Sequence, residues 1–160
     1  MTQLDQNKLH DFVGKKLGDL GGAFSVPTVR IGLRLGLFDA LHRDGPATAS
    51  ELAKRAGGLT ERYVLEWALA QAANGFVDYD PASEKFSLSP EQAMMFAMKD
   101  SPVYLAGAFD LIAAMIEGEP KVEHSFRTGA GVRWGDTAGP ATSTISFRTG
   151  CPRLRVRRPN

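Results

Sequence analysis

The sequence contains only one cysteine, Cys151, among its 160 residues. A single cysteine cannot form a disulfide bond within the chain or assemble a multi-cysteine zinc site. The three histidines, His10, His42 and His124, lie in unrelated segments without the short spacing of metal ligands. We therefore expect no metal site, and a reducing compartment is compatible with this composition.

Long apolar segments are also missing. The first residues include Asp5, Lys8 and Asp11 and have no apolar core of the signal-peptide kind, and no run approaches the roughly 20 residues of a membrane span. With 43% hydrophobic and 23% charged residues, the composition is that of a globular chain with one main core. We expect a cytoplasmic protein without membrane contacts.

Acidic residues are absent from the C-terminal part. All 18 lie before Pro140, where 14 basic residues leave a net charge of −4. From Pro140 on, Thr, Ser, Pro and Arg dominate without periodicity, so we expect residues 140–160 to be a disordered tail. The mildly acidic body does not suggest a nucleic-acid partner. The arginines of the tail are Arg148, Arg153, Arg155, Arg157 and Arg158.

The middle of the chain has the element order of a winged helix-turn-helix. The spacing of Thr48 and Glu51 predicts a capping box at the start of one helix. The glycine pair at 57–58 predicts a turn, and Thr60 is expected to cap a second helix over about residues 61–74. The core-facing residues of this second helix are expected to be Val64, Leu65, Ala68, Leu69 and Ala72.

The segment after this helix predicts the wing. Residues 76–80 and 86–88 are short alternating runs, and the turn-forming segment 81–85 joins them into a hairpin. Ser89-Pro90-Glu91-Gln92 then caps a further helix, which we expect to end at about Met98.

Apolar helices are predicted on both sides of this unit. Apolar residues recur at helical spacing from Leu9 until Gly21-Gly22 loosens or ends the helix, and a second helix is expected over about 24–35. After the wing, a helix over about 102–117 is apolar almost all round, and Gly118-Glu119-Pro120 is expected to break it.

These flanking helices are more apolar than a small winged helix can cover. For the N-terminal pair, a second copy of the chain and the winged helix of the same chain are both candidate covers. For the C-terminal helix, the candidates are another subunit, a further domain or the N-terminal pair. We predict a mainly α fold in which a winged helix-turn-helix with a small β-hairpin wing is flanked by helices at both ends. The predicted divisions of the chain are N-terminal dimerisation helices (1–44), a winged-helix domain (45–98), an apolar helix with a glycine-rich linker (99–139) and the tail (140–160).

The charge of the winged helix bears on its function. Between Pro46 and Pro90, four basic residues stand against six acidic residues, and the recognition helix carries Glu61 and Glu66 against Arg62. Because DNA affinity comes from neutralising phosphates, both groove-facing elements would repel DNA. A winged-helix transcriptional regulator nevertheless stays the alternative hypothesis.

No catalytic constellation is visible. The sequence lacks a nucleophile-elbow serine motif and a phosphate-binding Gly-Lys-Ser/Thr loop. Gly129-Ala130-Gly131 looks like part of a nucleotide loop, but it follows a polar segment rather than a buried strand. We therefore expect no catalytic and no cofactor-binding residue in this chain.

A set of short stretches, spread over about residues 8–139, follows one known pattern. They are Gly18–Phe24, Leu35–Phe38, Thr60–Val64, Gly75–Val77, Phe86–Ala93, Ser101–Tyr104, Glu119–Val122 and Trp134–Asp136. Together they resemble the N-terminal region of bacterial class I S-adenosylmethionine-dependent methyltransferases of the winged-helix, small-molecule type.

This resemblance implies a winged helix that dimerises and helps to close a substrate pocket, while a C-terminal Rossmann-like domain holds S-adenosylmethionine. The family continues into a strand and a Gly-x-Gly-x-Gly loop, whereas this sequence changes to the arginine-rich tail, which indicates a frameshift or a truncated gene. We therefore expect no cofactor and no activity in this chain alone, and a homodimer or pairing with a methyltransferase domain. The candidate substrate-facing residues are Phe109, Met115 and Trp134.

Overall fold

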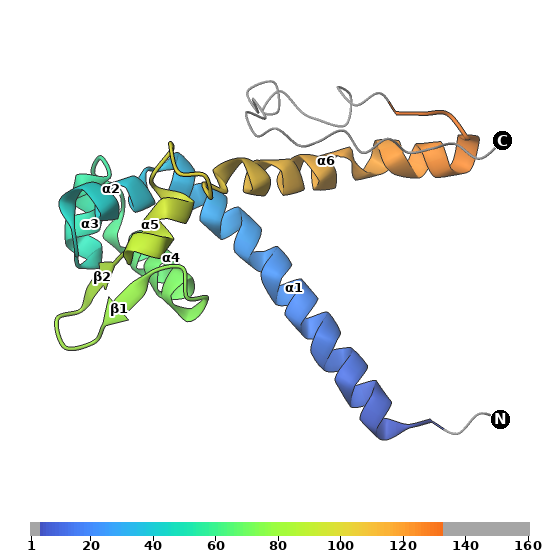
Figure 1. The fold of residues 1–160 in the computed structure, drawn as a ribbon, viewed down its shortest axis with the longest axis horizontal. Coiled ribbons are helices and arrows are strands. Elements are labelled where there is room, and N and C mark those ends of the chain that lie inside the picture. Colours follow the sequence, from blue (N-terminus) through green and yellow to red (C-terminus); the bar gives the residue numbers. More distant parts are fainter. Residues whose placement is uncertain (1–3, 133–160) are drawn as a thin grey trace.

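The computed structural model describes residues 4–132 of the chain (Figure 1). The described part is mainly α-helical with one two-stranded antiparallel sheet, which confirms the predicted fold class. Its elements are α1 (Gln6–Arg34), α2 (Leu37–Asp44), α3 (Ala49–Arg55), α4 (Glu61–Ala73), β1 (Asp78–Asp80), β2 (Lys85–Ser87), α5 (Pro90–Phe96) and α6 (Ala106–Thr128).

The elements α2 to α5, with β1 and β2, form one small body that we call the winged-helix unit. The long helices α1 and α6 both leave this unit and diverge from each other (Figure 1). The core of the unit is aromatic: the ring of Phe38 stacks on Phe96 with centroids 4.8 Å apart and meets Trp67 edge-on at 5.1 Å. In the wing, β1 and β2 pair with Tyr79 opposite the buried Phe86.

Two capping boxes fix the starts of short helices, as the sequence predicts. At α3, the Thr48 hydroxyl accepts from the Glu51 N–H at 3.3 Å, while the Glu51 carboxylate accepts from the Thr48 N–H at 2.9 Å. Ser89 and Gln92 make the same reciprocal pair at α5. Thr60 occupies the N-cap position of α4, but its side chain makes no capping hydrogen bond, so that part of the prediction is wrong.

The buried stripe of α4 differs from the predicted one. Leu65 and Leu69 are 39% and 40% exposed, whereas Trp67 and Gln71 are buried beside Val64. Positions 64, 67, 68 and 71 follow the helical spacing, so the two leucines lie just beside the stripe that faces the core. The buried Gln71 amide has no hydrogen-bond partner among the described residues, an arrangement that costs about 1–3 kcal/mol.

The predicted break at Gly21-Gly22 does not occur, because α1 is one continuous helix of 29 residues. The Asp5 carboxylate caps its first turn by accepting from the N–H groups of Asn7 and Lys8. Packing of Val29 into the core holds the other end. Glycine inside a helix costs only about 1 kcal/mol per residue, so a helix secured at both ends passes through the pair.

The predicted boundaries of the last helix are also wrong. The helix α6 begins at Ala106 and continues through Gly118-Glu119-Pro120 to Thr128. Proline keeps a helical φ and removes one backbone donor, a local penalty that the helix tolerates here. The helix ends where Gly129 adopts a left-handed φ of 72°.

Polar contacts tie both long helices to the unit. The Trp67 indole N–H donates to the Thr28 carbonyl at 2.8 Å, which holds α1 against α4. The Arg30 guanidinium pairs with the Asp110 carboxylate at 2.9 Å, and Arg30 is only 16% exposed, so this ion pair holds α6 beside α1.

We predict that Gly32→Ala lowers the free energy of unfolding by about 1–3 kcal/mol, the usual cost of overpacking a filled core. A Cβ atom at residue 32 would lie 2.3 Å from Trp67 Cζ2 and 2.8 Å from Phe38 Cε2. The control is Gly107→Ala, whose Cβ would meet nothing within 4 Å and which should leave stability unchanged or slightly higher. Urea unfolding of both variants is the measurement, and equal stability of the two would contradict the close packing.

We also predict a pH dependence at α3. The hydrogen bond from the Thr48 N–H lowers the pKa of the Glu51 carboxyl below its ordinary value of 4.5. A lowered folded-state pKa contributes stability that is present above the ordinary pKa and lost as the pH falls through the folded-state pKa. Glu51→Gln keeps an acceptor for the capping box but does not titrate, so thermal unfolding of this variant should change less between about pH 5 and pH 3. An identical pH profile of variant and wild type would be the contrary result.

Candidate functional site

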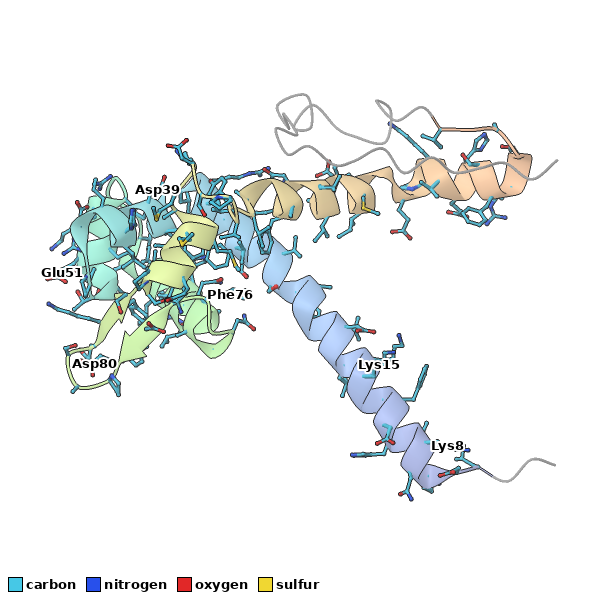
Figure 2. The ribbon with its side chains drawn as sticks, viewed as in Figure 1. Lys8, Lys15, Asp39, Glu51, Phe76 and Asp80 are labelled. Atoms are coloured by element: carbon cyan, nitrogen blue, oxygen red, sulfur yellow. The ribbon has the colours of Figure 1, made fainter. Side chains whose placement is uncertain are left out.

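The wing carries exposed negative charge. Asp78, Asp80 and Glu84 are all exposed, and Asp80 lies at the turn between β1 and β2 (Figure 2). A hydrogen bond from the Ser83 hydroxyl and a second one from the Ala82 N–H lower the pKa of the Asp80 carboxyl. The wing therefore presents a carboxylate that stays ionised at neutral pH.

The recognition helix α4 does not offer a free cation to a nucleic acid. The exposed Arg62 guanidinium lies 3.5 Å from the Glu66 carboxylate, one helical turn further along α4. Glu61 adds a second carboxylate in the first turn. The one arginine of α4 is thus paired within the helix, and the wing has three exposed carboxylates against one basic residue, Lys85.

The most exposed apolar surface near the C-terminal end of the described residues lies on α6. Ala113 and Ala114 on one side of this helix are buried, while five large apolar residues on the opposite side are 40% to 87% exposed. Their spacing places them within one face of the helix. This α6 apolar face consists of Ile112, Met115, Ile116, Val122 and Phe126.

The predicted substrate-facing residues do not come together in the structure. Phe109 is partly buried and packs against the core of the winged-helix unit, with its ring 6.1 Å from that of Phe96. Met115 is 65% exposed and belongs to the α6 apolar face. Six positions separate them along α6, which puts them on different sides of the helix. Trp134 lies outside the described residues.

A small apolar groove opens where α1 meets the start of α4. Its volume is about 230 Å³, and its walls include Ile31 and Leu35 of α1 with Tyr63 and Trp67 of α4. The sequence did not predict this groove, because its two walls come from segments that are distant in sequence. Tyr63 and Ile31 remain largely exposed at its mouth.

Between residues 4 and 132, the structure brings no three His, Cys, Asp or Glu side chains together in a way that could hold a metal ion. None of the helices in this range is long and apolar enough to cross a membrane.

The central part of the chain matches a known family model. Residues 23–98 match the family of Rv2258c-like winged helix-turn-helix domains. A comparison with curated proteins finds no match.

Several solved structures share the fold. "PigF with SAH" has 22% sequence identity, a TM-score of 0.59 and covers 73% of this chain. The mitomycin 7-O-methyltransferase MmcR has 23% identity, a TM-score of 0.60 and 78% coverage. The N,N-8-amino-8-demethyl-D-riboflavin dimethyltransferase RosA from Streptomyces davawensis has 23% identity, a TM-score of 0.54 and 80% coverage.

The chain spans only part of these proteins. The match covers 37% of the first two chains and 35% of the third, in their N-terminal part. At these identities the likeness establishes the fold. Residues 23–98 match the model of Rv2258c-like winged helix-turn-helix domains, and the observed order of α3, α4 and the wing is that of a winged helix-turn-helix.

Proposed function

We propose that this chain is the N-terminal dimerisation and substrate-lid module of a small-molecule methyltransferase that uses S-adenosylmethionine. The observation that carries the proposal is the α6 apolar face, which no described residue covers. An exposed apolar surface of this extent is typical of an interaction site. Two of the solved structures that share the fold are methyltransferases by name, MmcR and RosA. The part of them that matches this chain is N-terminal.

In this proposal a Rossmann-like domain packs on the α6 apolar face and completes a substrate pocket. Met115 lies in the middle of that face, which supports a contact with the substrate or with the covering domain. Phe109 anchors the same helix to the core of the winged-helix unit. We keep Phe109, Met115 and Trp134 as the proposed substrate-facing residues and 1–44, 45–98, 99–139 and 140–160 as the proposed divisions of the chain.

The described residues do not fit a site for S-adenosylmethionine, the methyl donor of such enzymes. A site of this kind needs a glycine-rich loop between a buried strand and the start of a helix. Within residues 4–132, the two strands form the wing, and the segment between β2 and α5 contains no glycine. The proposal therefore assigns the cofactor to another domain and no methyl transfer to this chain alone.

Dimerisation and a cytoplasmic location are further parts of the proposal. The long extended helix α1 supports dimerisation, since all of its residues from Gln6 to Phe24 are exposed in the single chain. A helix that is apolar and exposed over several turns gains most of its stability from packing against a partner.

The second candidate function is a DNA-binding transcriptional regulator, which the winged helix-turn-helix fold itself favours. The surface charge opposes it, because Asp78, Asp80 and Glu84 would lie close to DNA phosphates and Arg62 is already paired with Glu66. The five arginines after Pro140 could add only salt-sensitive attraction without sequence preference.

We predict that residues 1–139 show no submicromolar binding to duplex DNA at about 50 mM salt, a condition that favours electrostatic binding. Fluorescence anisotropy with mixed-sequence and operator-like duplexes is the measurement. The full chain, measured under the same conditions, shows how much the arginines after Pro140 add to binding. Submicromolar binding by residues 1–139 that is lost in Arg62→Ala would support the regulator instead.

We predict that calorimetric titration of the full chain with S-adenosylmethionine gives no saturable heat. The proposal further expects that the genomic sequence after the codon for Gly139 encodes, in one of its frames, a Rossmann-like domain with a Gly-x-Gly-x-Gly loop. Unrelated sequence there, or a clear binding heat of the chain alone, would count against the proposal.

That encoded domain also provides a direct binding test. Met115→Asp should weaken its association with this chain by at least about tenfold, because a carboxylate enters an apolar contact. Met98→Asp is the matched control, since Met98 is also exposed but lies outside the α6 apolar face.

A further inference from the structure

The wing has an open strand edge. Strand β1 pairs with β2 on one side, and no described residue pairs with its other side. On β2, the N–H and C=O groups of Phe86 both bond to Ala47 and therefore point away from β1. Because backbone groups alternate in direction along a strand, Lys85 and Ser87 make the bonds to β1, and the N–H and C=O groups of Tyr79 point outward. This edge thus offers an unpaired backbone donor and acceptor.

The two faces beside this edge differ in chemistry. Asp78 and Asp80 lie on one face and are both exposed, with Asp80 at the hairpin turn (Figure 2). Asp78 accepts a hydrogen bond from the Gln92 amide, but among residues 4–132 neither carboxylate forms an ion pair. On the other face, the Tyr79 ring stacks on the buried Phe86 and stays 38% exposed. The edge therefore fits a strand that alternates basic and apolar side chains.

One segment of this chain has that alternation. Residues 153–157 read Arg-Leu-Arg-Val-Arg, within a C-terminal stretch that otherwise has no periodicity, and they lie outside the described residues. We infer that this segment binds the open edge of β1 as an antiparallel strand, with Leu154 opposite Tyr79. This intramolecular contact goes beyond the proposed function and does not depend on it.

The register brings opposite charges together on the exposed face of the wing. Antiparallel pairing around Tyr79 places Arg153 opposite Asp80. It also places Arg155 opposite Asp78. Opposite charges at directly paired positions stabilise a sheet, and the apolar residues between the arginines fall on the face of the Tyr79 ring.

The antiparallel direction agrees with the ends of the edge. Pro81 follows β1 directly, and in this register it lies opposite Pro152. Neither residue has a backbone N–H, so the pairing ends there without leaving a donor unpaired. Antiparallel pairs are also slightly more stable per residue than parallel pairs.

The charges of the edge disfavour two other occupants. If the wings of two copies paired edge to edge around Tyr79, Asp78 of one copy would lie opposite Asp80 of the other, and like charges at paired positions destabilise a sheet. The phosphates of a nucleic acid meet the same repulsion. A cationic strand is therefore the occupant that the edge favours.

The chain between α6 and the segment is long enough to reach the wing. The helix α6 starts beside α5, where the Leu105 N–H donates to the Met95 carbonyl at 3.1 Å. Arg153 follows Val132 by 21 residues. A chain of this length spans up to about 70 Å, enough to return along α6, about 35 Å long, and to cross a unit of roughly 25 Å. Because segment and edge belong to one chain, the connection raises their local concentration.

Disulfide formation in the full chain tests the register. In the antiparallel pair, Ala82 lies opposite Cys151, so mild oxidation of the Ala82→Cys chain at about 1 μM should give an intramolecular disulfide, detected as a faster-migrating monomer on a non-reducing gel. Ala73→Cys is the matched control, because Ala73 is also exposed but lies at the end of α4. It should cross-link at least about tenfold more slowly. Equal rates, faster reaction of Ala73→Cys or mainly intermolecular products would overturn the inference.

Charge reversal in the Ala82→Cys chain tests the ion pairs. Arg153→Glu with Arg155→Glu should slow the disulfide by about tenfold at about 50 mM salt, since two attractive pairs become repulsive. Arg157→Glu with Arg158→Glu changes the net charge equally but places no glutamate opposite an aspartate of β1. This control should stay within about threefold of the parent rate. Equal slowing in both double variants would show attraction without a register and contradict the inference.

Hydrogen exchange at the Tyr79 N–H, followed by NMR in the full chain with its natural cysteine, tests the backbone pairing. Exchange should be at least about tenfold slower in the wild type than in Leu154→Pro, because proline removes the N–H that bonds to the Tyr79 carbonyl. Thr149→Pro lies outside the segment and should exchange like the wild type. Equally fast exchange in the wild type and in Leu154→Pro would overturn the strand pairing and leave the proposed methyltransferase module untouched.

Discussion

The close approach of α1 to the winged-helix unit at Gly32 is the contact on which the rest of the structure depends. The Trp67 ring lies against the bare backbone of Gly32, and its indole N–H binds the Thr28 carbonyl one turn earlier. Ring contacts continue from Trp67 through Phe38 and Phe96 to Phe109 of α6. One aromatic cluster therefore fixes both long helices to the same small body, and a side chain at position 32 would collide with two of its rings.

Fixing two long helices to a small core leaves much of their surface uncovered. Along α1, buried residues begin only at Ser25, and Arg30 with Asp110 holds α6 beside α1. Large apolar side chains stay exposed on both helices, and those of α6 form the α6 apolar face. The two helices diverge as they leave the unit (Figure 1), so each has its own exposed apolar surface, and the two surfaces can bind different partners.

Local signals in the sequence were sufficient where the stabilising contacts are local. The capping boxes at Thr48 and Ser89 need only residues three positions apart, and both form as expected. The glycine pair at 21–22 and Pro120 are also local signals, at about 1 kcal/mol for each glycine and about 3 kcal/mol for the proline, but both helices continue through them. The choice of Trp67 and Gln71 over Leu65 and Leu69 as core residues depends on which side of α4 faces α1, and only the tertiary structure settles that. The groove at Ile31 and Tyr63 comes from two segments distant in sequence, so no local pattern could place it.

The acidic wing shows how a DNA-binding scaffold can be used for another purpose. The stability of the winged-helix unit comes from its apolar core and its helix caps, and exposed charges contribute little to it. The sign of the surface charge can therefore change without loss of the fold. Here the Ser83 hydroxyl and the Ala82 N–H stabilise a charged Asp80 at the hairpin turn, which raises the electrostatic cost of approaching phosphate. An apolar surface has no electrostatic cost of this kind. In this chain, α1 and α6 expose large apolar side chains in addition to those on the recognition helix and the wing. Association through the flanking helices is therefore the use of the scaffold that its surface chemistry favours.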